Sequence, residues 1–206
     1  MAEAGTPSLR ENLKQITRRK LLDAAREAFE EHGYAKTSAE EITLRAGASR
    51  ATFYLHFGGK HDVLAEIVAE AHFTPVLELV ESLGSMGVPT VEEIRAWLDS
   101  FDAIYERTRG IMRAWVQAGG REGAPLRALA DEMREKFLDA MAAKVSAVLG
   151  RAGYEVAPED ARMRALMMFI EVERLCFYLH IRGLDFDVKA SLDLVARQWS
   201  SILAHR

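Results

Sequence analysis

Residues 37–60, TSAEEITLRAGASRATFYLHFGGK, decide how the rest of the chain is interpreted. The pattern predicts a short helix at about 38–46 and a second short helix at about 50–56. Gly47 lies between them and supplies the backbone freedom that a sharp turn requires. Two short helices joined by such a turn form a helix-turn-helix, whose second helix can enter the major groove of DNA.

Polar residues mark the start of both predicted helices. Thr37 and Glu40 form a capping-box pattern, in which the hydroxyl accepts from a backbone N–H and the carboxylate reaches back to the cap. Ser49 is a good N-terminal cap for the second helix. The caps support the predicted boundaries.

The second helix has an apolar face and a chemically varied outer face. Phe53 and Phe57 are four residues apart, so they can be buried together against Phe29 and Ile42. The other positions offer a guanidinium, hydroxyls, an imidazole and apolar groups, which suit contacts with phosphates, base edges and thymine methyls. These positions are Arg50, Ala51, Thr52, Tyr54, Leu55 and His56.

The rest of the chain is also predicted to be helical, because strand-like alternation is scarce. Gly33 follows the first helix where a helix-ending glycine belongs, and Pro75 could bend the fourth. We expect an all-α protein with a tail at 1–9, a three-helix helix-turn-helix domain at 10–60 and a larger helical bundle at 61–206. Nine helices are predicted, at about 9–32, 38–46, 50–56, 60–83, 90–107, 111–118, 125–152, 159–182 and 187–204.

Charge is unevenly distributed along the chain. Residues 10–60 hold ten Lys and Arg against seven Asp and Glu, a net of +3, whereas the whole chain carries −4, which leaves −7 for the rest. A basic end on an acidic body suits a protein that presents one end to phosphate. Ordinary variation in surface charge is the alternative explanation.

The composition indicates a globular protein of the cytoplasm. Hydrophobic residues make up 49% of the chain, enough for a substantial core. The first residues, MAEAGTPSLRENLKQ, lack the apolar stretch of a secretory signal, and no apolar run approaches the ~20 residues that span a bilayer. The single cysteine, Cys176, excludes an intrachain disulfide and fits a reducing compartment.

Motifs typical of enzymes are missing. We find no paired-histidine metal motif, no phosphate-binding glycine loop and no serine elbow, so no catalytic residue, metal or cofactor is expected. A redox sensor based on Cys176 is one alternative, although a lone thiol inside an apolar helix is more often inert. A DNA-binding protein without a ligand is another.

The stretch from about Thr17 to Leu64 resembles the DNA-binding domain of the tetracycline-repressor (TetR) family. The resemblance covers about a quarter of the chain, and the sequence TFYLHF followed by a lysine three residues on is its most specific part. The matching residues are Ala25, Phe29, Gly33, Tyr34, Thr37, Ile42, Ala46, Gly47, Ser49, Thr52, Phe53, Tyr54, Phe57, Lys60 and Leu64.

The resemblance implies roles for individual residues. Arg50, Ala51 and Thr52 lie where the family reads bases, with Ser49 and Leu55 beside them. Contacts mainly with phosphate are implied for Thr37, Tyr54, His56 and Lys60. Partial burial of Tyr54, packing of His56 and solvation of Lys60 are the alternatives. Gly58-Gly59 departs from the Ser or Asn that many members carry there, which predicts a more flexible junction.

The C-terminal body is rich in aromatic and sulfur-containing side chains. Such walls can line an apolar cavity that adapts to a ligand, although a filled core is the more usual meaning of an aromatic stripe. The TetR resemblance favours a cavity, so residues 61–206 are expected to bind a small, mainly apolar effector. The candidate lining residues are Trp97, Phe101, Tyr105, Met112, Trp115, Met133, Phe137, Met168, Phe169, Val172, Cys176 and Phe177.

Within this body, residues 168–178, MFIEVERLCFY, faintly resemble the corresponding helix of ethionamide-resistance-type regulators, whose pockets are long and apolar. Glu173 and Arg174 lie within this segment and could pair with neighbouring helices rather than with a ligand.

The resemblance also implies that the last two helices form a homodimer as a four-helix bundle. Closure of a monomer core is the alternative. The expected interface residues are Ala190, Leu194, Arg197 and Ile202, with Val195, Trp199 and Leu203 beside them. A two-fold dimer would place two recognition helices ~34–36 Å apart on a roughly palindromic double-stranded operator. We therefore expect a cytoplasmic repressor that a small effector releases from DNA.

Overall fold

The computed structural model describes residues 8–83, 87–119 and 123–203. Within these ranges every regular element is helical, which confirms the all-α prediction. The N-terminal elements are α1 (Leu9–Lys36), α2 (Ala39–Ala46), α3 (Arg50–His56) and α4 (Lys60–Val68), followed by the π-helical turn η1 (Ala69–Phe73) and α5 (Thr74–Ser82). The remainder comprises α6 (Val91–Gly119), α7 (Gly123–Arg151), α8 (Pro158–Cys176), the π-helical turn η3 (Phe177–Ile181) and α9 (Val188–Leu203).

The prediction of nine separate helices is wrong, because two of the predicted helices form a single one. Instead of helices at about 90–107 and 111–118, α6 runs without a break through Gly110. Glycine weakens a helix by about 1 kcal/mol, but Thr108, Ile111 and Met112 continue the buried face across it. Since α4, η1 and α5 are also continuous, and α8 continues into η3, the described chain has eight continuous helical segments.

Two predicted irregularities have a clear structural form. Gly33 has φ 74° and ψ 169°, so the first helix is interrupted there, as its sequence position predicted. The distortion near Pro75 lies just before it, in η1, where the Thr74 N–H bonds to the Ala69 carbonyl. A proline ring clashes with the carbonyl four residues earlier, and a widened turn accommodates that clash.

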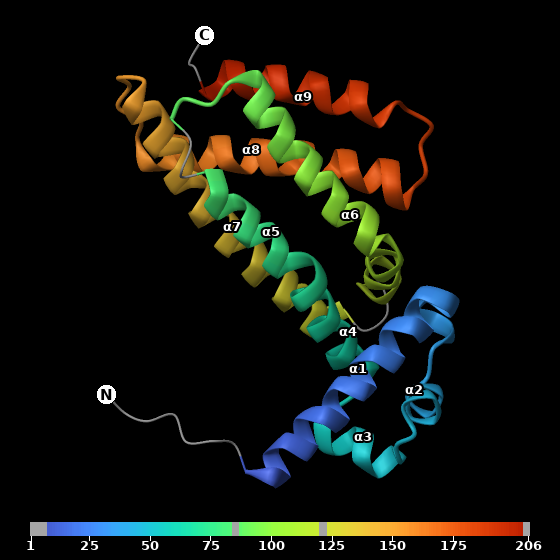
Figure 1. Cartoon of the computed structure of the whole chain (residues 1–206). Coiled ribbons are helices and arrows are strands. Elements are labelled where there is room, and N and C mark those ends of the chain that lie inside the picture. The colour runs from blue at the N-terminus through green and yellow to red at the C-terminus, as the bar shows by residue number, and fades with distance from the viewer. Residues whose placement is uncertain (1–7, 84–86, 120–122, 204–206) are drawn as a thin grey trace.

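Side chains pack into two cores. Figure 1 shows α1, α2 and α3 gathered at one end and the long helices α5 to α9 forming the body. The first core joins α1–α3 to Val63, Leu64 and Ile67 of α4, and it also takes Ile111 and Ala118 from α6. The second core lies among α5–α9. Helix α6 contacts α1 near one end and α9 near the other, so it links the two cores. The domain boundary at residue 60 stays a prediction.

Within the described residues, no helix is both long and apolar enough to cross a membrane. The same residues contain no group of three or more His, Cys, Asp or Glu side chains placed to hold a metal ion.

Candidate nucleic-acid interface and interior cavity

Helices α2 and α3 are held by caps and by a left-handed turn. Gly47 has φ 62° and ψ 33°, a conformation that favours glycine, and its N–H bonds to the Leu44 carbonyl. The Ser49 hydroxyl accepts from the Thr52 N–H at 3.0 Å, so the predicted cap of α3 is confirmed. The cap of α2 is Ser38, which accepts from the Glu41 N–H at 3.1 Å. The predicted Thr37–Glu40 capping box is therefore wrong by one residue.

The buried face of α3 fixes its orientation. Phe53 and Phe57 are buried in the first core together with Phe29 and Ile42, as their spacing predicted. Their ring centroids lie 5.7 Å apart. With these rings inside, the opposite face of α3 points away from the body.

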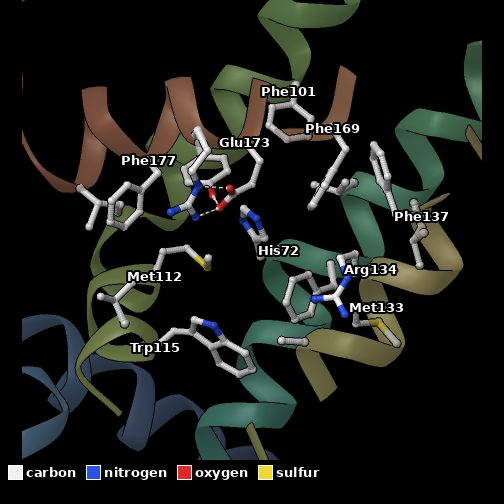
Figure 2. A pocket seen from close by; sticks show the side chains of 18 residues that line it. His72, Phe101, Met112, Trp115, Met133, Arg134, Phe137, Phe169, Glu173 and Phe177 are labelled. Atoms are coloured by element: carbon white, nitrogen blue, oxygen red, sulfur yellow. Dashed lines mark hydrogen bonds and ion pairs between the residues drawn. The ribbon is translucent and has the colours of Figure 1, made fainter. Parts of the chain in front are cut away.

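A cavity lies between the long helices of the body and η1. Its volume is about 320 Å³, within the range of small-molecule sites. Aromatic and aliphatic side chains dominate the wall, and Figure 2 shows them pointing inward from several helices. The lining residues are His72, Phe73, Val76, Leu77, Phe101, Tyr105, Met112, Trp115, Val116, Ala130, Met133, Arg134, Phe137, Phe169, Glu173, Arg174, Phe177 and Ile181.

Residues 21–67, which include both short helices, match the family "Bacterial regulatory proteins, tetR family". Residues 21–67 therefore form a TetR-type DNA-binding domain.

Curated relatives match over part of their length. The chain is 31% identical over 86 residues to the HTH-type transcriptional regulator SrpR of Pseudomonas putida, covering 39% of this chain and 40% of SrpR. It is 36% identical over 67 residues to YdgC of Bacillus subtilis, an uncharacterised HTH-type transcriptional regulator, covering 32% of this chain and 34% of YdgC. The matched part of each relative is thus less than half of it, and both are named as regulators rather than enzymes.

Solved structures match over nearly the whole chain. A TetR-family transcriptional regulator of Mesorhizobium loti superimposes with a TM-score of 0.72 at 23% identity, covering 93% of this chain and 96% of that one. SmeT, the repressor of the Stenotrophomonas maltophilia multidrug efflux pump SmeDEF, gives 0.65 at 26% identity, covering 91% of this chain and 90% of SmeT. The fold of the body is therefore that of TetR-family regulators as well.

The TetR-type helix α3 presents four of the predicted contact residues to solvent. Arg50 and Ala51 are exposed, Tyr54 retains 51% of its accessible surface and Leu55 retains 79%. Thr52 is half-buried and its hydroxyl lies 2.8 Å from the Ser49 hydroxyl. These residues share one outward surface, which we call the α3 face.

Thr37 and Lys60 are turned toward the protein instead. Thr37 is only 2% exposed, and its hydroxyl donates to the Gly33 carbonyl at 2.9 Å. The Lys60 ammonium donates to the carbonyls of Tyr34 and Thr37 at 2.8 and 2.9 Å, and it lies over the Tyr34 ring. Lys60 thus ties the start of α4 to the end of α1.

His56 is held at the edge of the α3 face. Its Nδ1 atom is buried with no hydrogen-bond partner among the described residues. Burial, and then the positive charges of Arg18 and Lys14, lower the pKa of His56 below its usual value. A neutral imidazole is therefore favoured there.

Arg18 is a structural residue that the sequence analysis did not single out. Its guanidinium pairs with Glu66, donates to the His56 carbonyl at 2.8 Å and lies 4.3 Å from the centre of the Phe57 ring. It therefore joins α1, the end of α3 and α4. No local motif marks it, because its partners are 38 to 48 residues away.

The Gly58-Gly59 step has an internal cap. The Gly58 N–H donates to the Asp62 carboxylate at 2.7 Å, which replaces the side-chain cap that Gly59 cannot provide. A Cβ atom at residue 58 would lie 2.9 Å from that carboxylate oxygen, so glycine permits the close approach.

The cavity brings together eight of the twelve predicted lining residues: Phe101, Tyr105, Met112, Trp115, Met133, Phe137, Phe169 and Phe177. The other four, Trp97, Met168, Val172 and Cys176, are buried in the second core and do not line it. They lie on the same helices as lining residues, but their side chains pack against neighbouring helices. Helical spacing alone does not tell which buried residues face the cavity and which face another helix.

Two polar residues of the wall, His72 and Arg134, were not predicted from the sequence. His72 comes from η1, and its Nδ1 lies 2.9 Å from the Thr108 hydroxyl. Glu173 pairs with Arg174 and accepts from the Tyr105 hydroxyl at 3.1 Å. The widened turns η1 and η3 both supply lining residues, among them Phe73 and Phe177.

Cys176 has an environment that suppresses thiol reactivity. It is fully buried, and burial followed by the charges of Asp102 and Glu173 raises the pKa of its thiol. The neighbouring Asp102 carboxylate is engaged by His180 Nε2 at 2.6 Å. A thiolate, the reactive form, is therefore disfavoured, which weighs against a redox sensor.

Proposed function

We propose that this protein is a DNA-binding transcriptional repressor whose α3 face reads a double-stranded operator. The observation that carries the proposal is the α3 face, which is exposed on a TetR-type domain. Phe53 and Phe57 are buried on the opposite side of the helix and anchor it in the core. Arg50 can reach phosphate or guanine, and Ala51 and Leu55 can contact thymine methyls. Thr37 is left out of this contact set because it is buried.

We further propose that the protein acts as a homodimer through α8 and α9. Val195, Trp199 and Leu203 are buried within one protomer, so the proposed interface leaves them out. An exposed apolar stripe remains at helical spacing along α8 and η3, and Leu194 of α9 adds to it. The stripe consists of Met163, Met167, Ile170 and Tyr178.

The cavity is proposed as the effector site. His72 and Phe73 belong to η1, which continues directly from α4, so a ligand against them touches the element that leads to the DNA-binding domain. Met112 and Trp115 lie on the part of α6 that packs against α1. A ligand that favours a different position of α4 would change the separation of the two α3 faces.

Release from DNA requires a difference in ligand affinity between the two states. A ~10⁴-fold preference, about 5.5 kcal/mol, would shift a 1:99 equilibrium to 99:1. A ligand with equal affinity for both states would leave DNA binding unchanged.

The proposal is tested by a pair of charge-matched variants. Arg50→Ala and Lys136→Ala each remove one exposed positive charge, but Lys136 lies on α7 and pairs with Glu132. We expect Arg50→Ala to weaken binding to genomic fragments retained by the wild type at least tenfold, whereas Lys136→Ala binds normally. Equal behaviour of the two variants would contradict a specific role for the α3 face.

A further inference from the structure

The cavity contains one buried histidine whose proton can be located from its partners. His72 is only 4% exposed, and its Nδ1 lies 2.9 Å from the Thr108 hydroxyl oxygen. That hydroxyl is also 2.7 Å from the Ile104 carbonyl oxygen. A carbonyl oxygen can only accept, so the single hydroxyl proton of Thr108 is donated to Ile104. The Thr108 oxygen must then accept from His72, and Nδ1 carries the hydrogen.

The other ring nitrogen is consequently an acceptor. Burial lowers the pKa of His72 to about 4, so the imidazole is neutral near pH 7 and carries only one N–H. With that hydrogen on Nδ1, Nε2 presents a lone pair. Among the described residues no hydrogen bond to Nε2 is found, and Figure 2 shows the imidazole reaching into the cavity.

The charged side chains that line the cavity are already paired. The Glu173 carboxylate pairs with Arg174 and also accepts from the Tyr105 hydroxyl. At another part of the wall, Arg134 donates to Asp131 at 2.8 Å. Neither a cation nor an anion would therefore gain an unpaired counter-charge. A carboxylate would in addition face the lone pair of His72.

We propose that the cavity selects uncharged aromatic molecules that carry a hydroxyl group, which donates a hydrogen bond to His72 Nε2. This inference rests on the proposed role of the cavity as the effector site. Aromatic side chains surround the imidazole. The Tyr105 ring meets it edge-on with the centroids 4.8 Å apart. Phe101, Phe137 and Phe169 also line the cavity, and Trp115 lies across it from Phe101 in Figure 2. Planar rings fit such walls, and the hydroxyl fixes their orientation.

Two matched probes test the role of the hydroxyl. 2-Naphthol and 2-methoxynaphthalene share one ring system, but only the first can donate a hydrogen bond. We expect calorimetry with the wild-type protein to give about tenfold tighter binding of 2-naphthol, the usual effect of one buried hydrogen bond. Equal affinities, or no binding of either probe, would overturn the inference.

Substitution of His72 tests whether its Nε2 atom is the acceptor. His72→Phe keeps an aromatic ring but removes the acceptor nitrogen. The ratio of the affinities for 2-naphthol and 2-methoxynaphthalene should therefore fall to about one, while the affinity for 2-methoxynaphthalene changes little. A preference that persists in this variant would contradict the role of Nε2. Thermal unfolding of the variant checks that the cavity is still formed.

Thr108 is the positioning residue for this acceptor, and it offers an independent test. Thr108→Val keeps the shape but removes the oxygen that accepts from Nδ1, so the hydrogen is free to move to Nε2. The 2-naphthol preference should fall, and ¹⁵N signals of His72 should show loss of the Nδ1–H form. An unchanged preference with unchanged signals would overturn the assignment.

The outcome also separates this inference from the proposed function. If 2-naphthol binds with the expected preference but does not release DNA, the ligand chemistry stands and the effector role of the cavity fails. If both probes bind equally and release DNA equally, the effector role stands and the hydroxyl selection fails.

Discussion

At the scale of single residues, Tyr54 is the most direct probe of DNA contact. Its side chain is half exposed and its ring meets Phe53 edge-on, so it contributes little to the core. We expect Tyr54→Ala to weaken operator binding about tenfold, the loss of one good contact, without unfolding the protein. Fluorescence anisotropy with labelled DNA measures the affinity, and circular dichroism checks the fold. Wild-type affinity would remove Tyr54 from the contact set.

Arg18 is expected to matter for stability rather than for base reading. Arg18→Ala removes the ion pair with Glu66, the bond to the His56 carbonyl and the cover over Phe57. The side chain is about one-third exposed, so the loss should be about 1–2 kcal/mol. Urea unfolding measures it. Arg10→Ala, an exposed site earlier on α1, is the control that should change stability little.

His72 gives a prediction about pH. Burial lowers its pKa from 6.5 to about 4. Between these two pH values the imidazole is mostly protonated in the unfolded chain but mostly neutral in the folded protein. Stability is therefore lost as the pH falls from about 6.5 to about 4. Between pH 7 and pH 5 the wild type should lose about 2 kcal/mol more than His72→Phe. Unfolding curves measured at both pH values give this difference. An equal loss of stability in the two proteins would contradict the prediction.

At the scale of elements, the junction between α1 and α4 depends on Lys60. Its ammonium is engaged by two carbonyls, so Lys60→Met should cost about 1 kcal/mol of stability. The dependence of DNA affinity on salt should stay nearly the same, because the ammonium faces inward. If Lys60 contacts phosphate in the complex, the slope of log affinity against log salt would instead fall by about 1.

The helical elements differ in how well the sequence predicts them. The α2–turn–α3 segment was predicted to within one residue, because caps, a turn glycine and paired phenylalanines all act within a few residues. The continuity of α6 and the shape of the cavity wall were not predicted. Both depend on which face of a long helix meets distant partners, as Met112 and Cys176 illustrate. His72 carried no signal, since a lone histidine has no local partner in the sequence.

At the scale of the whole molecule, the proposed dimer rests on the stripe along α8. Met167 is more than half exposed near the middle of that stripe. Met167→Glu should convert dimer to monomer, because it buries a charge in an apolar interface. Sedimentation velocity measures the mass. Glu159→Gln, near the start of α8, serves as the control. A variant that stays dimeric would place the interface elsewhere.

At this scale, the cavity and the DNA-binding domain are connected by shared helices. Helix α6 contributes Trp115 to the cavity and Gln117 to the DNA-binding domain, where the Gln117 side chain accepts from the Tyr34 N–H at 3.0 Å. Helix α4 and η1 form the second connection. A ligand in the cavity therefore touches two elements that support α1 and α3.

The most direct test of the central claim is selection of DNA from a random duplex pool, followed by sequencing. A dimer with two α3 faces should enrich one inverted repeat, with half-site centres about 10 base pairs, or a multiple, apart. Arg50→Ala, taken through the same selection, should lose this enrichment. A wild-type pool without an inverted repeat, or the same repeat enriched by Arg50→Ala, would contradict the account.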